Sequence, residues 1–314
     1  MAGVWILAEG LESGRELINI GQTLAREQNS TLTAITWQGD LNQELIAYGV
    51  DEILLLPALP EDEPRQAYIP IIVERARLDH PEIILFSATL LGKELAARIA
   101  GQLGAGLGSE CSGLRWIKEE AALEMERLFY GGAAVQTIRC RQAPRMATVS
   151  QRSFAPAERQ EGRSGNVIEL PAPPPSPVRV IERKSRTQTA GDIAGARVVV
   201  CVGRGFEKEA DLELARQLAQ ALGGEIACTR PISQEVCWLS EDVCIGLSAK
   251  KVKPDLYIGL GISGQIQHLT GIRDARVIVA VNRDANAPIF AAVDYGIAGD
   301  LYEVVPQLLA ILQK

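Results

Sequence analysis

Residues 255–268 read "DLYIGLGISGQIQH", a short apolar run that ends in glycines, a serine, two glutamines and a histidine. The run has the length and the Ile/Leu content of a buried strand, and the polar residues after it indicate a turn that leads into a helix. A strand followed directly by a helix is the repeating unit of a parallel sheet. We therefore expect an α/β fold around this segment.

The alternation of strand and helix continues on both sides of this stretch, from residue 196 to the C-terminus. The predicted strands cover 197–203, 225–229, 255–261 and 276–282, and the predicted helices cover 208–222 and 301–312. These strands are continuous Val/Ile runs, which suit a parallel sheet buried on both faces. Residues 196–314 are therefore predicted to form a doubly wound, Rossmann-like domain.

The first 153 residues predict a second α/β domain. Strand-like runs cover 4–9, 31–37, 51–57 and 82–88, with helical segments between them, such as 65–78 and 92–103. This alternation predicts a mostly parallel sheet. After Gly106 the strand-like runs follow one another without helices, which predicts an antiparallel extension; these runs are 111–119, 122–132, 134–141 and 145–152.

Residues 154–195 are predicted to be a linker between the two domains. They contain "PAPPPSP" at 171–177, and three consecutive prolines fit neither a helix nor a central strand. The one strand expected in the linker is a short edge strand over 178–185.

Composition excludes several classes of function. The net charge is −7 and the pI is about 5.2, which argues against nucleic acid or an anionic membrane as partner. The six cysteines form no C-x-x-C pair and there are two histidines, so no zinc or iron–sulfur spacing is present. Cys201 lies in "VVVCVG", where a thiol is a small hydrophobe, so we expect reduced, buried thiols. The chain has no basic leader and no apolar run long enough to span a bilayer, so we expect a cytoplasmic protein without direct membrane insertion.

Ligands of doubly wound sheets bind beyond the carboxyl ends of the strands. Five polar segments follow the predicted strands at that edge, at 202–213, 227–239, 241–255, 260–271 and 277–306. Each alone has a structural interpretation, as a tight turn, a solvated arginine, an ordinary loop or a capped helix. Together they favour a nucleotide-like ligand. They hold no nucleophile–base pair, paired acids or metal ligands, so we expect a cofactor cradle without acid–base chemistry.

Particular residues in these segments suit an anionic cofactor. Arg204 stands between two glycines that would let backbone amides approach a phosphate. Arg230 offers a fixed cation after a strand. Ser263 is predicted near a helix N-terminus, where unpaired amides face the crevice. His268, one turn later, either adds a donor or a cation there or satisfies a nearby carbonyl.

Four stretches carry a resemblance to a known family: "VGRGF" (202–206), "CTRP" (228–231), "VKPDLYIGLGISGQIQHLTGI" (252–272) and "VIVAVNRDANAPIFAAVDYGIAGDLYEVVP" (277–306). They closely resemble the FAD domain of the electron-transfer flavoprotein alpha subunit. Residues 92–111 and 127–138 are similar to the N-terminal domain of the same family, so the resemblance covers the chain. It is closest to the bacterial branch that serves dedicated pathways, such as fatty acid beta-oxidation, carnitine metabolism and nitrogen fixation.

The resemblance implies that the C-terminal domain binds FAD and that the chain forms a heterodimer with an electron-transfer flavoprotein beta subunit. The pair would shuttle electrons from a dehydrogenase, for example of the acyl-CoA type, or a reduced carrier to a quinone-linked or other acceptor oxidoreductase. The chain would then be an electron carrier with no substrate chemistry of its own. The alternatives are an NAD(P)-dependent oxidoreductase and a non-redox adenine-nucleotide-binding subunit.

The resemblance also implies roles for individual residues. Arg204 would lie by the phosphate or flavin side of the cleft, Arg230 with Thr229 beside the isoalloxazine, and the Ser248 hydroxyl near flavin N5. The family usually reads Gln-Val-Gly-Gln-Thr-Gly where this chain has "CIGLSA" at 244–249. The remaining cofactor-binding residues that the resemblance implies are backbone contacts at Ile245, Gly246 and Leu247, pyrophosphate contacts at Ser263, Gly264, Gln265, Ile266, Gln267 and His268 (the histidine also reaching the flavin O2 edge), and adenosine-end residues Asn282, Asp300 and Leu301.

Overall fold

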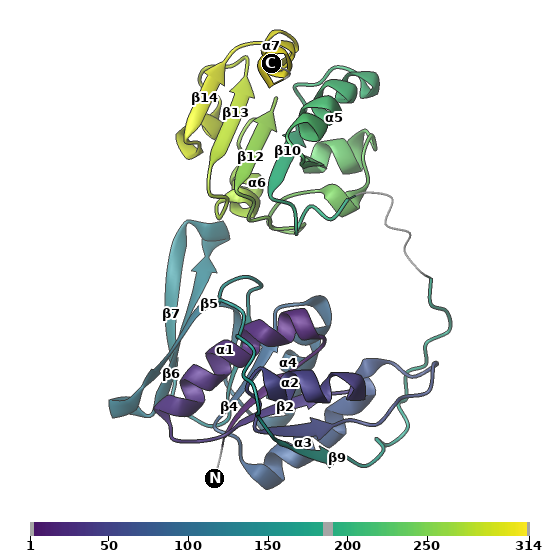
Figure 1. Ribbon diagram of the computed structural model, residues 1–314, viewed down its shortest axis with the longest axis vertical. Helices are drawn as coiled ribbons and strands as arrows, with labels where there is room; N and C mark the ends of the chain where they lie inside the picture. Colours follow the sequence, from purple (N-terminus) through teal and green to yellow (C-terminus); the bar gives the residue numbers. More distant parts are fainter. Residues whose placement is uncertain (1–2, 185–190, 313–314) are drawn as a thin grey trace. The chain divides into compact units, whose positions relative to one another are not determined.

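The computed structural model describes residues 3–184 and 191–312, and the chain divides into two compact units between residues 184 and 185 (Figure 1). Both units are α/β, each built on its own mainly or wholly parallel sheet. The predicted fold class is therefore confirmed. Each unit is described by itself below.

Within residues 3–184, nine strands form one sheet in the order β7-β6-β5-β8-β4-β1-β2-β3-β9. The strands are β1 (Val4–Leu7), β2 (Leu32–Thr36), β3 (Glu52–Leu55), β4 (Ile83–Ser87), β5 (Leu107–Ile117), β6 (Ala122–Phe129), β7 (Ala134–Cys140), β8 (Arg145–Val149) and β9 (Asn166–Glu169). The helices are α1 (Leu11–Glu27), α2 (Asn42–Ala47), α3 (Ile69–Asp79) and α4 (Leu90–Leu103), with short turns η1 (Gly39–Leu41), η2 (Arg65–Tyr68), η3 (Lys118–Glu120) and η4 (Tyr130–Gly132).

Side chains of β1 alternate between two apolar clusters on opposite faces of this sheet. Val4 and Ile6 pack with residues of α1, whereas Trp5 and Leu7 pack with residues of α3 and α4. Burial on both faces explains why the predicted strands are unbroken apolar runs.

The antiparallel extension is confirmed for β5, β6 and β7, which pair antiparallel in that order. It is wrong for the last predicted strand. β8 returns to the middle of the sheet and pairs parallel with both β4 and β5. All five residues of β8 are buried, which a central position requires.

The start of the predicted linker contributes to the N-terminal sheet, because β9 pairs parallel with β3 at its edge. The edge strand expected over 178–185 is wrong for residues 178–184, which form neither strand nor helix. β9 already occupies the free edge of β3, and the later segment is tied by single bonds such as Val180 N to Asp62 O (2.7 Å). Residue 185 lies outside the described residues.

Within residues 191–312, five strands form an all-parallel sheet in the order β11-β10-β12-β13-β14. The strands are β10 (Val198–Val202), β11 (Glu225–Cys228), β12 (Leu256–Leu260), β13 (Ile278–Asn282) and β14 (Tyr295–Ala298). The helices and helical turns are η5 (Glu209–Asp211), α5 (Leu212–Ala221), η6 (Pro231–Glu235), η7 (Glu241–Val243), α6 (Ile266–Ile272), η8 (Pro288–Ala292) and α7 (Leu301–Leu312). The four predicted strands are all present, and β14 was not predicted.

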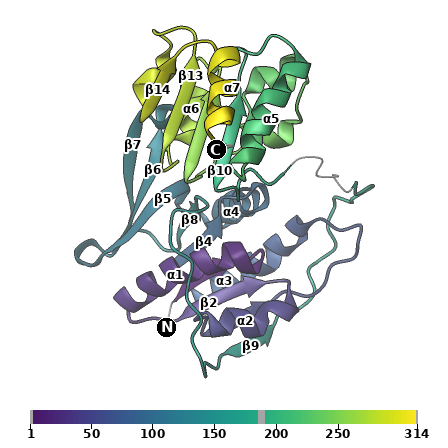
Figure 2. The ribbon, with the colours of Figure 1, turned by 45° about the horizontal axis from the view of Figure 1, so that its top comes forward.

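The strand order reverses between β10 and β12, since β11 lies on one side of β10 and the later strands on the other. Right-handed connections then send the chain to opposite faces of the sheet. α5 and α7 contact each other on one face, as Figure 2 shows. The edge of the sheet at this reversal, beyond the carboxyl ends of β10 and β12, is where doubly wound sheets bind ligands.

No helix in the described parts of the chain combines the length and the apolar character needed to cross a bilayer.

Candidate functional site

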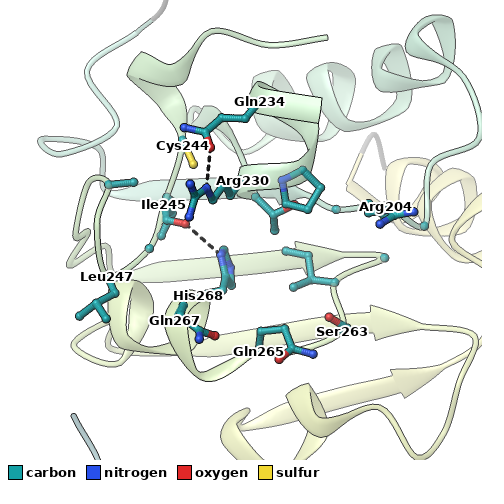
Figure 3. Close-up of a pocket in the computed structure, with 18 of the residues that line it drawn as sticks. Arg204, Arg230, Gln234, Cys244, Ile245, Leu247, Ser263, Gln265, Gln267 and His268 are labelled. Atoms are coloured by element: carbon teal, nitrogen blue, oxygen red, sulfur yellow. Dashed lines mark hydrogen bonds between the residues drawn. The ribbon is translucent and has the colours of Figure 1, made fainter. Parts of the chain in front are cut away.

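A cavity of about 580 Å³ lies beyond the carboxyl ends of the C-terminal strands, at the reversal between β10 and β12 (Figure 3). Its volume falls within the range of about 300–1,000 Å³ that is typical of small-molecule sites. It is lined by Gly203, Arg204, Gly205, Thr229, Arg230, Pro231, Gln234, Glu241, Cys244, Ile245, Gly246, Leu247, Ser248, Ala249, Gly261, Ile262, Ser263, Gln265, Gln267, His268, Asn282 and Arg283.

The loops after β10 and β12 touch through two glycines at the base of this cavity. Gly205 N donates to Gly261 O at 2.9 Å, and a Cβ added at Gly205 would lie 2.5 Å from Gly261 Cα. Only glycine permits that approach. The glycines of "VGRGF" therefore hold the two loops together, and Arg204 between them extends outward, with its side chain 73% exposed and 3.5 Å from Glu235.

The turn after β12 lies at the cavity, where Ser263, Gln265 and Gln267 form part of the lining. It is anchored from outside, because Asn282 Nδ2 donates to Ile262 O (2.8 Å) and Ile289 N donates to Ser263 O (3.0 Å). Hydrogen bonds among residues 3–184 and 191–312 leave the N–H groups of residues 263–267 without an acceptor. Unpaired amides of this kind are what an anionic ligand needs.

The helix after this turn starts later than the sequence predicts. Gly264 has φ of 90°, which is outside the helical region, and α6 begins at Ile266 with Gln265 as its N-cap. Ser263 is therefore in the turn and does not cap the helix. The turn, more than the helix end, carries the free amides.

Charged side chains around the cavity are mainly cationic. The described lining residues include three arginines, Arg204, Arg230 and Arg283, and one carboxylate, that of Glu241. Arg230 Nε donates to Gln234 Oε1 at 2.5 Å, a contact that orients the exposed guanidinium at the cavity (Figure 3). This excess of positive charge suits a ligand with phosphate groups.

Burial disfavours a charge on His268, which argues against the cation considered from the sequence and for the residue that satisfies a nearby carbonyl. The residue is 6% exposed, and burial lowers the pKa of its ring to about 4. Its Nδ1 lies 3.2 Å from Ile245 O, and its Nε2 lies 2.7 Å from the Tyr257 hydroxyl. Because a carbonyl only accepts, Nδ1 carries the proton and Tyr257 donates to Nε2. His268 thus ties α6 to the segment at Ile245.

Most of the predicted cofactor-binding residues line the cavity, and four do not. Gly264 shapes the turn, and Ile266 is 51% exposed. Asp300 caps α7 by accepting from Tyr302 N at 2.8 Å. Leu301 is buried in the core, where its side chain packs beside Gly261.

Several lining residues were absent from the predicted set. Gly203, Gly205 and Gly261 were part of quoted motifs, but their close contact could not be read from the sequence. Gln234 and Glu241 lie in the short helical turns η6 and η7 between β11 and β12, which are too short for a periodic pattern to mark a position. The other residues that the prediction missed are Pro231, Cys244, Ala249, Ile262 and Arg283.

Comparison with known proteins identifies the family. The model for the electron transfer flavoprotein domain matches residues 10–175, and that for the electron transfer flavoprotein FAD-binding domain matches residues 192–273. Proteins named FixB from Escherichia coli O127:H6 and from Shigella dysenteriae serotype 1 are each 32% identical over 314 residues, covering 99% of this chain and 98% of the relative. A solved structure, MurG of Acinetobacter baumannii, is 11% identical with a TM-score of 0.36, too low to bear on function.

These matches agree with the site. A crevice at a strand-order reversal, with free turn amides beside three arginines, fits the pyrophosphate of a dinucleotide. The match to the FAD-binding domain includes the turn after β12, the glycine contact between Gly205 and Gly261, and His268. The resemblance seen in the sequence is thereby confirmed, and with it FAD as the cofactor of this domain. The chain belongs to the electron transfer flavoprotein family, as a member of the alpha-subunit type whose C-terminal unit is the FAD-binding domain.

Proposed function

We propose that the cavity at the β10–β12 reversal holds the FAD and that the chain carries electrons as one half of a heterodimer with a beta subunit. The donor would be a dehydrogenase and the acceptor a separate oxidoreductase. The observation that supports this most directly is the segment 263–267, whose N–H groups have no acceptor among the described residues and of which Ser263, Gln265 and Gln267 line the same cavity as three arginines. When bound, FAD supplies reversible storage of electrons on its ring system.

At the phosphate end, the amides of residues 263–267 would donate to the pyrophosphate oxygens. Arg204 and Arg283 add positive charge at the cavity wall. Asn282 is already used as the anchor of Ile262 O, so its contribution is to hold the turn in place. Asp300 and Leu301 remain proposed for the adenosine end, where Asp300 sets the start of α7.

At the ring end, Arg230 is the fixed cation. Its guanidinium, held by Gln234, would stabilise the negative charge that a flavin ring gains on reduction and so raise the potential. Thr229 lies beside it, 8% exposed. The exposed Ser248, which also lines the cavity, keeps a hydroxyl that can donate to the ring.

His268 would act through position. Both ring nitrogens are occupied, by Tyr257 and Ile245 O, so the imidazole holds residues 245–247 against α6. Leu247 N donates to Gln267 O at 2.7 Å and completes that contact. The wall that faces the ring is thus fixed without a charge on His268.

The nicotinamide-dependent alternative is not favoured by these groups. An oxidoreductase that acts on a small substrate needs a positioned acid or base beside the reacting atoms. Both ring nitrogens of His268 are hydrogen-bonded within the protein, and Glu241 stands without a partner base in the lining set.

The test is co-expression of the chain with the beta subunit from the same genome. We expect a yellow heterodimer that releases FAD on denaturation and is bleached by a physiological dehydrogenase. A panel of purified acyl-CoA dehydrogenases, used one at a time as reductant, then determines whether the donor is of that class. A colourless heterodimer that takes up no added FAD would overturn the proposal.

A further inference from the structure

Two cysteines sit side by side on the wall of the cavity. Cys228 is the last residue of β11, and Cys244 pairs with it across an isolated parallel bridge, in which Ile245 N donates to Cys228 O at 2.9 Å. Strands paired in this way lie about 4.8 Å apart, and bridge partners project to the same face. That separation falls within the Cα–Cα range of about 4.4–6.8 Å that a disulfide needs. Both thiols are free in this structure.

The two thiols differ in acidity. The Cys228 thiol hydrogen-bonds to Cys244, which lowers the pKa of Cys244, and the Ser233 hydroxyl and the Arg230 guanidinium lower it further against burial and the Glu241 carboxylate. The same hydrogen bond, with burial, raises the pKa of Cys228. Cys244 is therefore the better thiolate of the pair.

The two thiols also differ in access. Cys244 is 4% exposed and lines the cavity, whereas Cys228 is 0% exposed and is not part of the lining. A reagent in the cavity meets Cys244 first, and Cys228 is the nearest second thiol. A thiolate that reaches a cavity, next to a thiol that does not, is the arrangement of an attacking and a resolving cysteine.

We propose that Cys228 and Cys244 form a redox dithiol that closes to a disulfide in the wall of the cofactor cavity, with a low-molecular-weight disulfide as oxidant. The Cys244 thiolate attacks one sulfur of the oxidant, a mixed disulfide forms, and one thiolate leaves and takes up a proton. Cys228 loses its proton to solvent and attacks Cys244 Sγ, which releases the second thiolate for protonation. The cysteines lose two electrons and the oxidant gains two, ending as two thiols.

The experiment uses the full chain in its heterodimer after FAD has been removed, with oxidised glutathione as oxidant. Free thiols are blocked with N-ethylmaleimide and peptides are identified by mass spectrometry. We expect a Cys228–Cys244 linked peptide that dithiothreitol abolishes. In the reduced protein, Cys244 should be alkylated at pH 7 at least about tenfold faster than Cys201, which is 0% exposed and whose pKa burial raises to about 12.

Variants separate the roles of the two thiols. Cys228→Ser should leave Cys244 as a stable mixed disulfide with glutathione, and Cys244→Ser should leave Cys228 unmodified. Cys237→Ser, which removes an exposed thiol outside the cavity, should form the linked peptide as the wild type does. Absence of the linked peptide in the FAD-free wild type, linkage through Cys237 instead, or alkylation of Cys244 no faster than Cys201 would each overturn the proposal. None of these readouts depends on electron transfer, so they stand apart from the test of the flavin.

Discussion

Protonation of His268 is the perturbation whose energetic effect the structure defines best. Burial lowers the pKa of the ring from 6.5 to about 4, so the unfolded chain binds this proton more tightly than the folded chain does. The neutral ring therefore stabilises the C-terminal unit above pH 6.5, and that stability is lost as the pH falls toward 4. At about 1.4 kcal/mol per pKa unit, the full effect is about 3 kcal/mol, of which about 2–3 kcal/mol is lost between pH 7 and pH 4.5.

Hydrogen exchange followed by mass spectrometry measures this loss of stability in the C-terminal unit alone. The slowest amides of β10 and β12 report the opening of the C-terminal sheet, and their rates are corrected for the intrinsic effect of pH. The comparison is with His268→Gln, which keeps a donor and an acceptor but does not titrate. The wild type should lose about 2–3 kcal/mol more than this variant over the same range of pH.

A matched control uses the other histidine. His80 is the exposed, left-handed C-cap of α3 with φ of 52°, a conformation that asparagine tolerates. His80→Asn should therefore keep the wild-type dependence on pH. Parallel profiles for the wild type and His268→Gln would refute the reasoning. They would show that the pKa of His268 does not differ between the folded and the unfolded chain.

Three further predictions concern the cavity. Gly205→Ala should lower the free energy of unfolding by about 1–3 kcal/mol and weaken FAD retention, because the added Cβ would lie 2.5 Å from Gly261 Cα. Thermal unfolding measures the loss, and Gly101→Ala, whose added Cβ would have nothing within 4 Å, is the control. Arg283→Gln should weaken FAD binding by about tenfold at low salt and less at high salt, measured by fluorescence titration, whereas Arg216→Gln, paired with Glu213 on α5, should not. Ser248→Ala should lower the two-electron flavin potential by about 10–30 mV in spectroelectrochemistry, which corresponds to the loss of a hydrogen bond of about 0.5–1.5 kcal/mol. Ser248→Thr keeps the hydroxyl and should have the wild-type potential. An unchanged potential in Ser248→Ala would show that the hydroxyl does not contact the ring.

The central strands were predictable because their burial on both faces produces continuous apolar runs in the sequence. β10 and β12 are continuous apolar runs, and the polar residues after them correctly marked the edge of the sheet where the cavity lies. The alternation of strand and helix was sufficient for a parallel sheet. The cavity also gathered most of the residues that the resemblance implied.

The edges of both sheets were not predictable in the same way. β14 is four exposed residues, and β9 lies in a segment of turn-forming residues, so neither has the apolar pattern of a central strand. Their positions are set by the free edges of β13 and β3. The parallel return of β8 likewise depends on β4, far away in the sequence, and a run of strands without helices gave no indication of it.

In the site, what the sequence left open was the environment of each side chain. The sequence allowed His268 to be a cation or a satisfied core residue, and the choice depends on Tyr257 and the carbonyl of Ile245, which lie on other elements. The glycine pair at 205 and 261 likewise has a meaning only once two loops are known to touch.

That glycine contact divides the site into a part that resists substitution and a part that tolerates it. In a saturation library, positions 205 and 261 should each accept little besides glycine, since any side chain at one displaces the backbone of the other. The exposed residues 247–249 carry no such constraint. Directed evolution of this flavoprotein could therefore vary residues 247–249 to change its redox behaviour, while Gly205 and Gly261 are kept.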